Sequence, residues 1–90
     1  MALEKYGAEA AVVECAAALD WAAPKFGWEG WPDRMIIWSP GRHFWVEAKT
    51  SKGRLTPAQK VRIKWLRVRG EMVFIPESRG EVVTLFALLV

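Results

Sequence analysis

The sequence predicts a small α/β protein with the order helix, strand, strand, helix, strand, followed by a C-terminal strand or short helix. Three observations support this fold class: an alanine-rich N-terminal stretch, two apolar runs on either side of a Ser-Pro-Gly-Arg turn, and a capping sequence that starts a second helix. Ninety residues, of which 52% are hydrophobic and 26% charged, suit one globular domain spanning residues 1–90.

The first helix is expected from about Leu3 to Ala23. Alanine dominates this stretch, strand-type alternation is absent, and Pro24 would end the helix. Val12 belongs to its apolar stripe, and Glu9 lies about one turn earlier on the same side. We therefore expect one carboxylate at the end of the buried helix face.

A loop rich in Gly and Trp, residues 24–32, leads into a predicted hairpin. Its strands should be Arg34–Trp38 and His43–Lys49, joined by a turn at residues 39–42. In an extended chain, alternate side chains share a face. One face of the second strand should carry Phe44, Val46 and Ala48, and the other His43, Trp45, Glu47 and Lys49.

The second helix has clear start and stop signals. Thr56 is suited to the N-cap, Pro57 to the first helical position, and Gln59 to the third, where it would complete a capping box. The helix should run to about Arg69 and end at Gly70.

The C-terminal part is less strongly patterned. Residues 72–75 favour a third strand that Pro76 would close. Within residues 81–90, Val82-Val83-Thr84 favours a strand, whereas Leu85–Leu89 suits a short helix. Both alternatives remain open at this point.

Charge is distributed unevenly along the chain, whose net charge is +3. Residues 48–70 contain eight basic side chains and no acidic one, while all ten acids lie elsewhere. A one-sided basic segment is typical of proteins that bind polyanions such as nucleic acids. The alternative, a solvated helix face, usually mixes both signs.

Two acidic residues should meet at the open end of the hairpin. Counting outward from the turn places Asp33 opposite Glu47 or Ala48, and such cross-strand neighbours have Cβ atoms about 4.5–5.5 Å apart. Paired carboxylates with a backbone carbonyl suit Mg²⁺, and Lys49 on the same face could stabilise charge on a phosphate. The simpler alternative is a turn aspartate and an exposed Glu47–Lys49 pair on an edge strand.

Pro32-Asp33 followed by Glu47-Ala48-Lys49 resembles the PD…(D/E)xK signature of the restriction-endonuclease-like nucleases. A fuller ordered set resembles the virus-type replication-repair nuclease domain (VRR-NUC), in the minimal stand-alone form typical of phages. The resemblance extends from about Glu4 to Pro76 and implies a small mixed sheet flanked by helices. The set consists of Glu9, Lys25, Gly30-x-Pro32-Asp33-Arg34, Glu47-x-Lys49, Gly53-x-Leu55 and Gln59.

This resemblance implies a structure-selective DNA endonuclease that depends on Mg²⁺ or Mn²⁺ and acts in replication or repair, with branched or four-way junction DNA as candidate substrates. Asp33 and Glu47, with the carbonyl of Ala48, would bind the metal, and Lys49 would be the catalytic lysine. Glu9 would support the metal directly or through water. Two further residues would support the site, Lys25 and Gln59, the latter in addition to its capping role.

Basic and aromatic side chains outside this motif have candidate roles in DNA binding. The expected phosphate track consists of Lys52, Arg54, Lys60, Lys64 and Arg67. Trp28 and Trp31 are able to stack on bases, but packing over the core is the favoured interpretation. His43 is expected at the surface near the turn, and one histidine with one cysteine cannot form a zinc site.

A homodimer is expected because six tryptophans and the apolar tail Leu85–Val90 are hard to bury in one small domain. Both stripes of the second helix, Val61-Trp65-Val68 and Ile63-Leu66, are apolar. No signal-peptide pattern is present, the longest apolar run is far shorter than the roughly 20 residues of a membrane helix, and Cys15 is the single cysteine. We therefore expect the cytosol of a bacterium or phage-infected host, with neither membrane nor organic cofactor.

Two other functional classes are compatible with the sequence. One is a nucleic-acid-binding module that has the basic helix but no catalytic metal. The other is a dimerisation subunit in which the acidic residues are structural. Only the nuclease hypothesis requires a bound divalent metal, so a measurement of metal binding distinguishes it from both alternatives.

Overall fold

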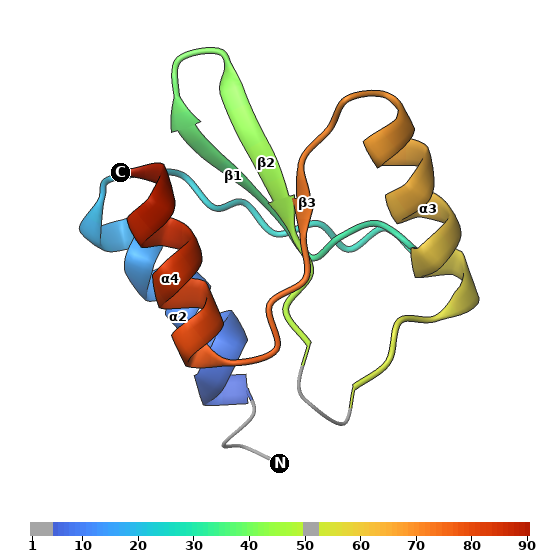
Figure 1. Ribbon diagram of the computed structural model, residues 1–90, viewed down its shortest axis with the longest axis horizontal. Helices are drawn as coiled ribbons and strands as arrows, with labels where there is room; N and C mark the ends of the chain where they lie inside the picture. The colour runs from blue at the N-terminus through green and yellow to red at the C-terminus, as the bar shows by residue number, and fades with distance from the viewer. Residues whose placement is uncertain (1–4, 50–52) are drawn as a thin grey trace.

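The computed structural model describes residues 5–49 and 53–90, and the predicted track residue Lys52 lies outside these ranges. A short π-helix, η1, leads directly into the first α-helix, and three strands and two further helices follow (Figure 1). Their bounds are η1 Lys5–Glu9, α2 Ala10–Ala18, β1 Arg34–Ser39, β2 Arg42–Val46, α3 Pro57–Val68, β3 Val73–Phe74 and α4 Arg79–Leu89. The predicted order of elements is therefore confirmed.

The three strands form a mixed sheet in the order β1-β2-β3. β1 and β2 make the predicted antiparallel hairpin, with Arg34 opposite Val46, and Gly41 takes the positive φ of 76° that its turn requires. β3 pairs in parallel with β2, so α3 is the crossover between them. β2 is shorter than predicted, but Glu47 N–H still donates to Phe74 O (2.9 Å) and Lys49 N–H to Pro76 O (2.9 Å).

The predicted end of the first helix is wrong. The helix stops at Ala18 rather than Ala23, because Asp20 adopts a left-handed conformation (φ 58°) and Trp21 N–H folds back to Ala16 O (2.8 Å). Aspartate tolerates this region better than most residues. Pro24 therefore lies beyond the helix and does not end it.

The chain after α2 runs extended beside β1, which the sequence did not indicate. Ile37 N–H donates to Ala22 O (2.9 Å) and Met35 N–H donates to Pro24 O (3.1 Å), and isolated bridges join Ala22 to Ile37 and Lys25 to Arg34. These bonds satisfy the outer edge of the sheet. They also bring Lys25 beside the start of β1.

The start of α3 is as predicted. Gln59 N–H donates to Thr56 Oγ1 (3.1 Å), and Thr56 N–H donates to Gln59 Oε1 (2.9 Å), which makes a complete capping box. After the helix, Gly70 has a φ of +88°. The helix therefore begins and ends where its sequence signals predict.

Residues 79–89 form a helix, so the strand alternative for the C-terminal segment is wrong. Ser78 caps α4 by accepting from Glu81 N–H (3.1 Å). Val82 and Phe86, one turn apart, are buried against the core. These helical contacts outweigh the strand preference of the β-branched residues at 82–84.

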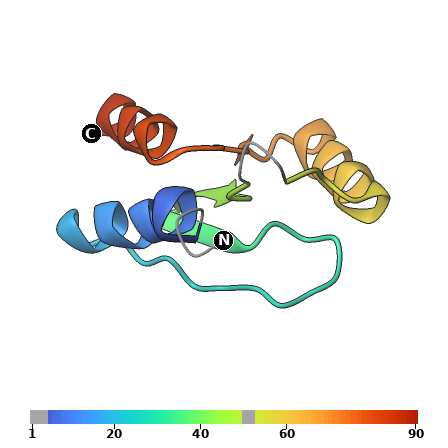
Figure 2. The same ribbon diagram turned by 90° about the horizontal axis from the view of Figure 1, so that it is seen from below.

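Helices cover the sheet on both sides (Figures 1 and 2). One core joins η1, α2 and α4 to one face of β1 and β2. Its buried residues are Ala8, Ala11, Val12, Ala16, Ile36, Phe44, Val46, Val82 and Phe86. A second core joins α3 to the other side, through Trp45, Ile63, Leu66 and Val73. No helix in the described part of the chain is long and apolar enough to cross a membrane.

Candidate active site

Asp33 and Glu47 lie side by side at the open end of the hairpin. Because Arg34 pairs with Val46, the register places Asp33 opposite Glu47 rather than Ala48. Asp33 N–H donates to Glu47 Oε1 at 3.1 Å, which joins the two segments. The turn at residues 39–42 and the buried faces of both strands set this register, so the pair was predictable from the sequence.

Glu47 is a buried carboxylate, with only 1% of the residue exposed. Lys49 Nζ lies 3.2 Å from Glu47 Oε2 and is itself mostly buried. Burial raises the pKa of the Glu47 carboxyl, and the neighbouring Asp33 charge raises this pKa further, while Lys49 opposes both effects. A buried acid beside a second acid and one lysine favours binding of an additional cation.

Glu9 does not join these two acids but meets two basic side chains. Its Oε1 atom lies 3.3 Å from Lys25 Nζ and 3.8 Å from Arg34 NH2. Arg34 NH1 also donates to Ala23 O (2.7 Å), so this guanidinium links the extended segment to β1. Within residues 5–49 and 53–90, no three His, Cys, Asp or Glu side chains gather closely enough to hold a metal ion. The metal-supporting role of Glu9 stays a prediction.

A cavity of about 540 Å³ opens beside Lys49. Arg54 and Lys60 contribute positive charge to it, and Glu77 contributes an acidic side chain that sequence reasoning did not single out. Glu77 follows the carbonyl of Pro76, to which Lys49 N–H donates, and only the pairing of residues 47–49 with residues 74–76 brings it here. No motif in the sequence indicates that position.

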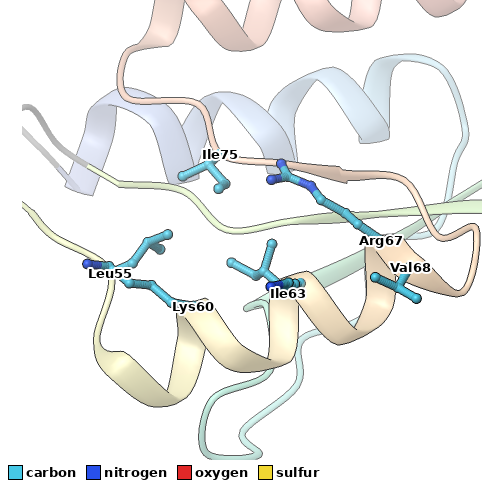
Figure 3. A pocket seen from close by; sticks show the side chains of 7 residues that line it. Leu55, Lys60, Ile63, Arg67, Val68 and Ile75 are labelled. Carbon is cyan, nitrogen blue, oxygen red and sulfur yellow. The ribbon is translucent and has the colours of Figure 1, made fainter.

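A second cavity, of about 420 Å³, adjoins the first along α3 and shares Leu55, Lys60 and Ile75 with it (Figure 3). Lys64 and Arg67 also line this cavity. Arg67 extends from α3 toward β3, where NH2 donates to Val73 O at 2.7 Å. Four of the five residues of the predicted phosphate track thus line adjoining cavities, although Arg67 also fixes β3.

The tryptophans of the 24–32 loop differ from each other. Trp31 packs against the second core and lies 5.4 Å from Trp45 between ring centroids, as the favoured interpretation predicted. Trp28, in contrast, is 61% exposed and outside both cores, so the packing interpretation is wrong for this residue. The remaining predicted site residue, Gln59, is engaged in the capping box.

The donor atoms at the hairpin end fit a hard divalent cation. Two adjacent carboxylates, one of them buried, provide oxygen ligands, and within the described residues Lys49 is the cation in ion-pair contact with Glu47. Mg²⁺ characteristically takes one or two carboxylates and completes its octahedral shell with waters and substrate phosphates. Two acidic ligands are therefore enough for this arrangement.

Comparison with known proteins gives one informative match. No family model and no curated protein matches the chain. Among solved structures, the chain is similar to one described as "VRR_NUC domain", with 28% sequence identity and a TM-score of 0.79. The match covers 88% of this chain and 89% of the other. This match, together with the mixed sheet flanked by helices, confirms the expected resemblance and fold.

Proposed function

We propose that this chain, which has the fold of a VRR-NUC nuclease domain, is a divalent-metal-dependent endonuclease that cuts branched DNA. The observation that carries the proposal is the buried Glu47 carboxylate, which lies against Asp33 and Lys49 where a basic cavity begins. A buried acid of this kind costs folding stability, and a bound cation offsets that cost.

Asp33 and Glu47, with the main-chain carbonyl of Ala48, would hold the metal. Mg²⁺ or Mn²⁺ bound there supplies Lewis-acid polarisation of a phosphate oxygen and lowers the pKa of a bound water. The hydrogen bond from Asp33 N–H keeps Glu47 Oε1 aimed at the open end of the hairpin. The site therefore meets the substrate with its two acids already positioned.

Lys49 has a separate role. Its ammonium group lies 3.2 Å from Glu47 Oε2 and also lines the cavity, so it can reach a phosphate held in that space. A fixed cation there stabilises the negative charge that develops on the phosphate during hydrolysis and orients the attacking water. Loss of Lys49 should therefore affect catalysis more than metal binding.

Arg54, Lys60 and Lys64 would hold the DNA backbone. They line the two adjoining cavities that lead away from Lys49, and contacts of this kind position phosphates without reading bases. Binding should therefore be salt-dependent and independent of sequence. A small, shallow site has little surface with which to specify a sequence. The branched substrate is proposed because the sequence motif resembles that of structure-selective nucleases.

A homodimer would bring two such sites into fixed relation, which suits paired cuts in a branched substrate. α4 carries the best candidate surface, since Val83, Leu88 and Val90 are exposed and Leu85 and Leu88 line a shallow apolar hollow with Phe74. A two-fold contact through this helix would cover them. Sedimentation equilibrium at micromolar concentration tests it: an active monomer would contradict the paired-site proposal.

The activity is tested by cleavage of hairpin, flap, nicked, supercoiled and four-way DNA with Mg²⁺ or Mn²⁺. Asp33→Asn, Glu47→Gln and Lys49→Ala should each reduce the cleavage rate by at least about 100-fold while DNA binding persists. Glu14→Gln is the matched control, because Glu14 pairs with Arg79 on the exposed surface of α2 and α4. Full activity in any of the three variants would overturn the site assignment, and metal-independent DNA binding without cleavage would favour the binding-module alternative.

A further inference from the structure

One flank of α3 carries a cluster of aromatic and cationic side chains outside the proposed catalytic site. Arg62, Trp65 and Arg69 are spaced by three and four residues and so share a helix face. None of them lines the cavity in Figure 3, whose helix residues are Lys60, Ile63, Lys64, Arg67 and Val68. Trp31 and Trp28 of the preceding loop complete this group, here called the Trp–Arg patch.

The guanidinium groups of the patch are held against indole rings. Arg62 Cζ lies 4.7 Å from the ring centroid of Trp31 and 4.8 Å from that of Trp65. Arg69 Cζ lies 3.8 Å from the Trp65 ring, and Arg69 NH1 donates to Trp65 O at 3.1 Å. These cation–π contacts fix planar groups that would otherwise be mobile.

Much of this aromatic surface faces solvent. Trp65 is 40% exposed, and Trp28 meets Phe26 and Trp31 in edge-type contacts that leave most of its indole uncovered. Neither Arg62 nor Arg69 has an acidic side chain within ion-pair distance in the described part of the chain. Exposed indoles next to unpaired guanidiniums match a ligand that has flat rings and negative charge.

We propose that the Trp–Arg patch binds an unpaired segment of nucleic acid, with bases stacked on the exposed Trp28 ring and on the outer faces of the arginine planes that cover Trp65. Stacking of this kind tolerates any base, and nearby guanidiniums add attraction for phosphates. The identification of this ligand as an arm of the cleaved substrate rests on the proposed function. The binding itself depends only on the exposed rings and charges.

The patch is connected to the candidate active site through buried residues. Trp31 precedes Asp33 with only the buried Pro32 between them, and Trp45, two residues before Glu47, lies 5.4 Å from Trp31. The basic cavities lie on the other flank of α3. The substrate class that fits both flanks is DNA in which a duplex adjoins a single-stranded segment, with α3 at the boundary.

A second copy of the chain fits this surface less well. A two-fold contact through the patch would bring the arginines of both copies together, and neither arginine has a carboxylate within ion-pair distance among the described residues. A protein interface would also be expected to use the exposed side chains of Val61 and Val68, which adjoin the patch on α3. A nucleic-acid strand has no need of these aliphatic groups.

The proposal is tested by fluorescence anisotropy with a labelled oligothymidylate and with a blunt duplex of the same length. Both are measured without divalent metal, so that the result does not depend on cleavage. Trp28→Ala should weaken binding of the single strand about tenfold, and Arg62→Gln with Arg69→Gln should do so by at least as much. Binding of the duplex should change less than about twofold for Trp28→Ala.

Two control variants separate the alternatives. Lys64→Gln removes a charge from the opposite flank of α3 and should weaken both ligands by similar factors. Val61→Ala should change the affinity for neither ligand, because it removes an aliphatic side chain and leaves the aromatic rings of the patch in place. Equal loss of single-strand and duplex binding in Trp28→Ala, or no loss of either, would overturn the proposal.

Sedimentation of the same variants tests whether the patch is instead a contact between two copies of the chain. A dimer that becomes a monomer on Trp28→Ala or Val61→Ala would assign the patch to a contact between copies and overturn the proposal. If Trp28→Ala selectively loses single-strand binding while the wild type cleaves no DNA, the proposal for the Trp–Arg patch is supported and the nuclease proposal is overturned. If the wild type cleaves DNA but Trp28→Ala has no selective effect on single-strand binding, only the proposal for the Trp–Arg patch is overturned.

Discussion

The two faces of the sheet differ in what they contribute, although the same strand supplies both. Toward α2 and α4, β2 presents Phe44 and Val46, which are fully buried among apolar neighbours. Toward α3, the same stretch presents Trp45 and then Glu47 and Lys49, where a buried charge meets a basic cavity. Alternation along β2 and the three residues that follow it thus separates the side chains that stabilise the fold from those proposed for chemistry.

This division explains how a small chain tolerates an unfavourable group. Burial of the Glu47 carboxylate opposes folding, because the charged form loses hydration. The apolar face, with the contacts of Ile36, Phe44 and Phe86, contributes the opposing free energy. We therefore expect substitutions on the α2/α4 face to change stability, and those on the α3 face to change metal and DNA binding.

The largest expected effect is on the α2/α4 face. Phe44→Ala should lower the free energy of unfolding by about 3–5 kcal/mol, since Phe44 is completely buried and touches the rings of Phe74 and Phe86. Val68→Ala is the matched control on α3, where the side chain is 74% exposed, and should change it by less than about 0.5 kcal/mol. Urea unfolding measures both. Equal losses in the two variants would contradict the division between the faces.

A smaller effect is expected in the salt dependence of DNA binding. Replacing Arg54, Lys60 and Lys64 with glutamine should reduce the slope of log K against log salt by about 0.9 for each phosphate that the variant no longer neutralises. Arg67 is left intact because it holds the Val73 carbonyl. Arg42→Gln, at the hairpin turn, should leave the slope unchanged. An unaltered slope in the triple variant would place the phosphate-binding side chains elsewhere.

The smallest effect concerns Glu71, at the end of the sheet far from the proposed site. Its carboxylate accepts from Trp45 Nε1 (2.8 Å) and pairs with His43 Nε2 (2.6 Å). The hydrogen bond from Trp45 lowers the pKa of Glu71, His43 lowers it further, and burial opposes them. Because the folded pKa is lowered, the stabilisation is present above the unfolded pKa and is lost as pH falls through the folded value.

Glu71→Gln should therefore reduce stability at neutral pH, by less than about 1 kcal/mol since the pair is partly exposed. The difference from wild type should vanish at a pH below the lowered pKa of Glu71. Urea unfolding at the two pH values measures it. A difference that persists in acid would show that packing rather than charge is responsible.

Local signals in the sequence predicted the hairpin and α3 well. The Pro40-Gly41 turn and the buried alternation of β2 set the register that brings Asp33 to Glu47, and Thr56 with Gln59 defines the start of α3. The end of α2 and the helical state of the C-terminal segment depended instead on backbone conformation and tertiary contacts that these signals do not encode. Asp20 ended α2 early in a left-handed conformation, and burial of Val82 and Phe86 made residues 79–89 helical.

The same distinction between local signals and long-range contacts applies to the candidate site. Side chains fixed by the hairpin register were predictable, whereas those brought in by long-range pairing were not. Glu77 enters the cavity only because residues 72–76 pair with residues 45–49. The ion pairs of Glu9 with Lys25 and Arg34 were not predictable either, because the extended segment after α2 carries Lys25 back to β1.

Thermal unfolding with and without Mg²⁺ tests whether the buried Glu47 carboxylate binds a metal ion. Burial raises the pKa of Glu47, so the stability this group contributes is present below the unfolded pKa and is lost as pH rises through the folded value. At neutral pH, metal-free Glu47→Gln should melt at a higher temperature than metal-free wild type. Mg²⁺ should raise the melting temperature of the wild type and of Glu14→Gln but not that of Glu47→Gln. If Mg²⁺ stabilises Glu47→Gln as much as the wild type, the metal does not bind at this carboxylate and the proposed metal site is wrong.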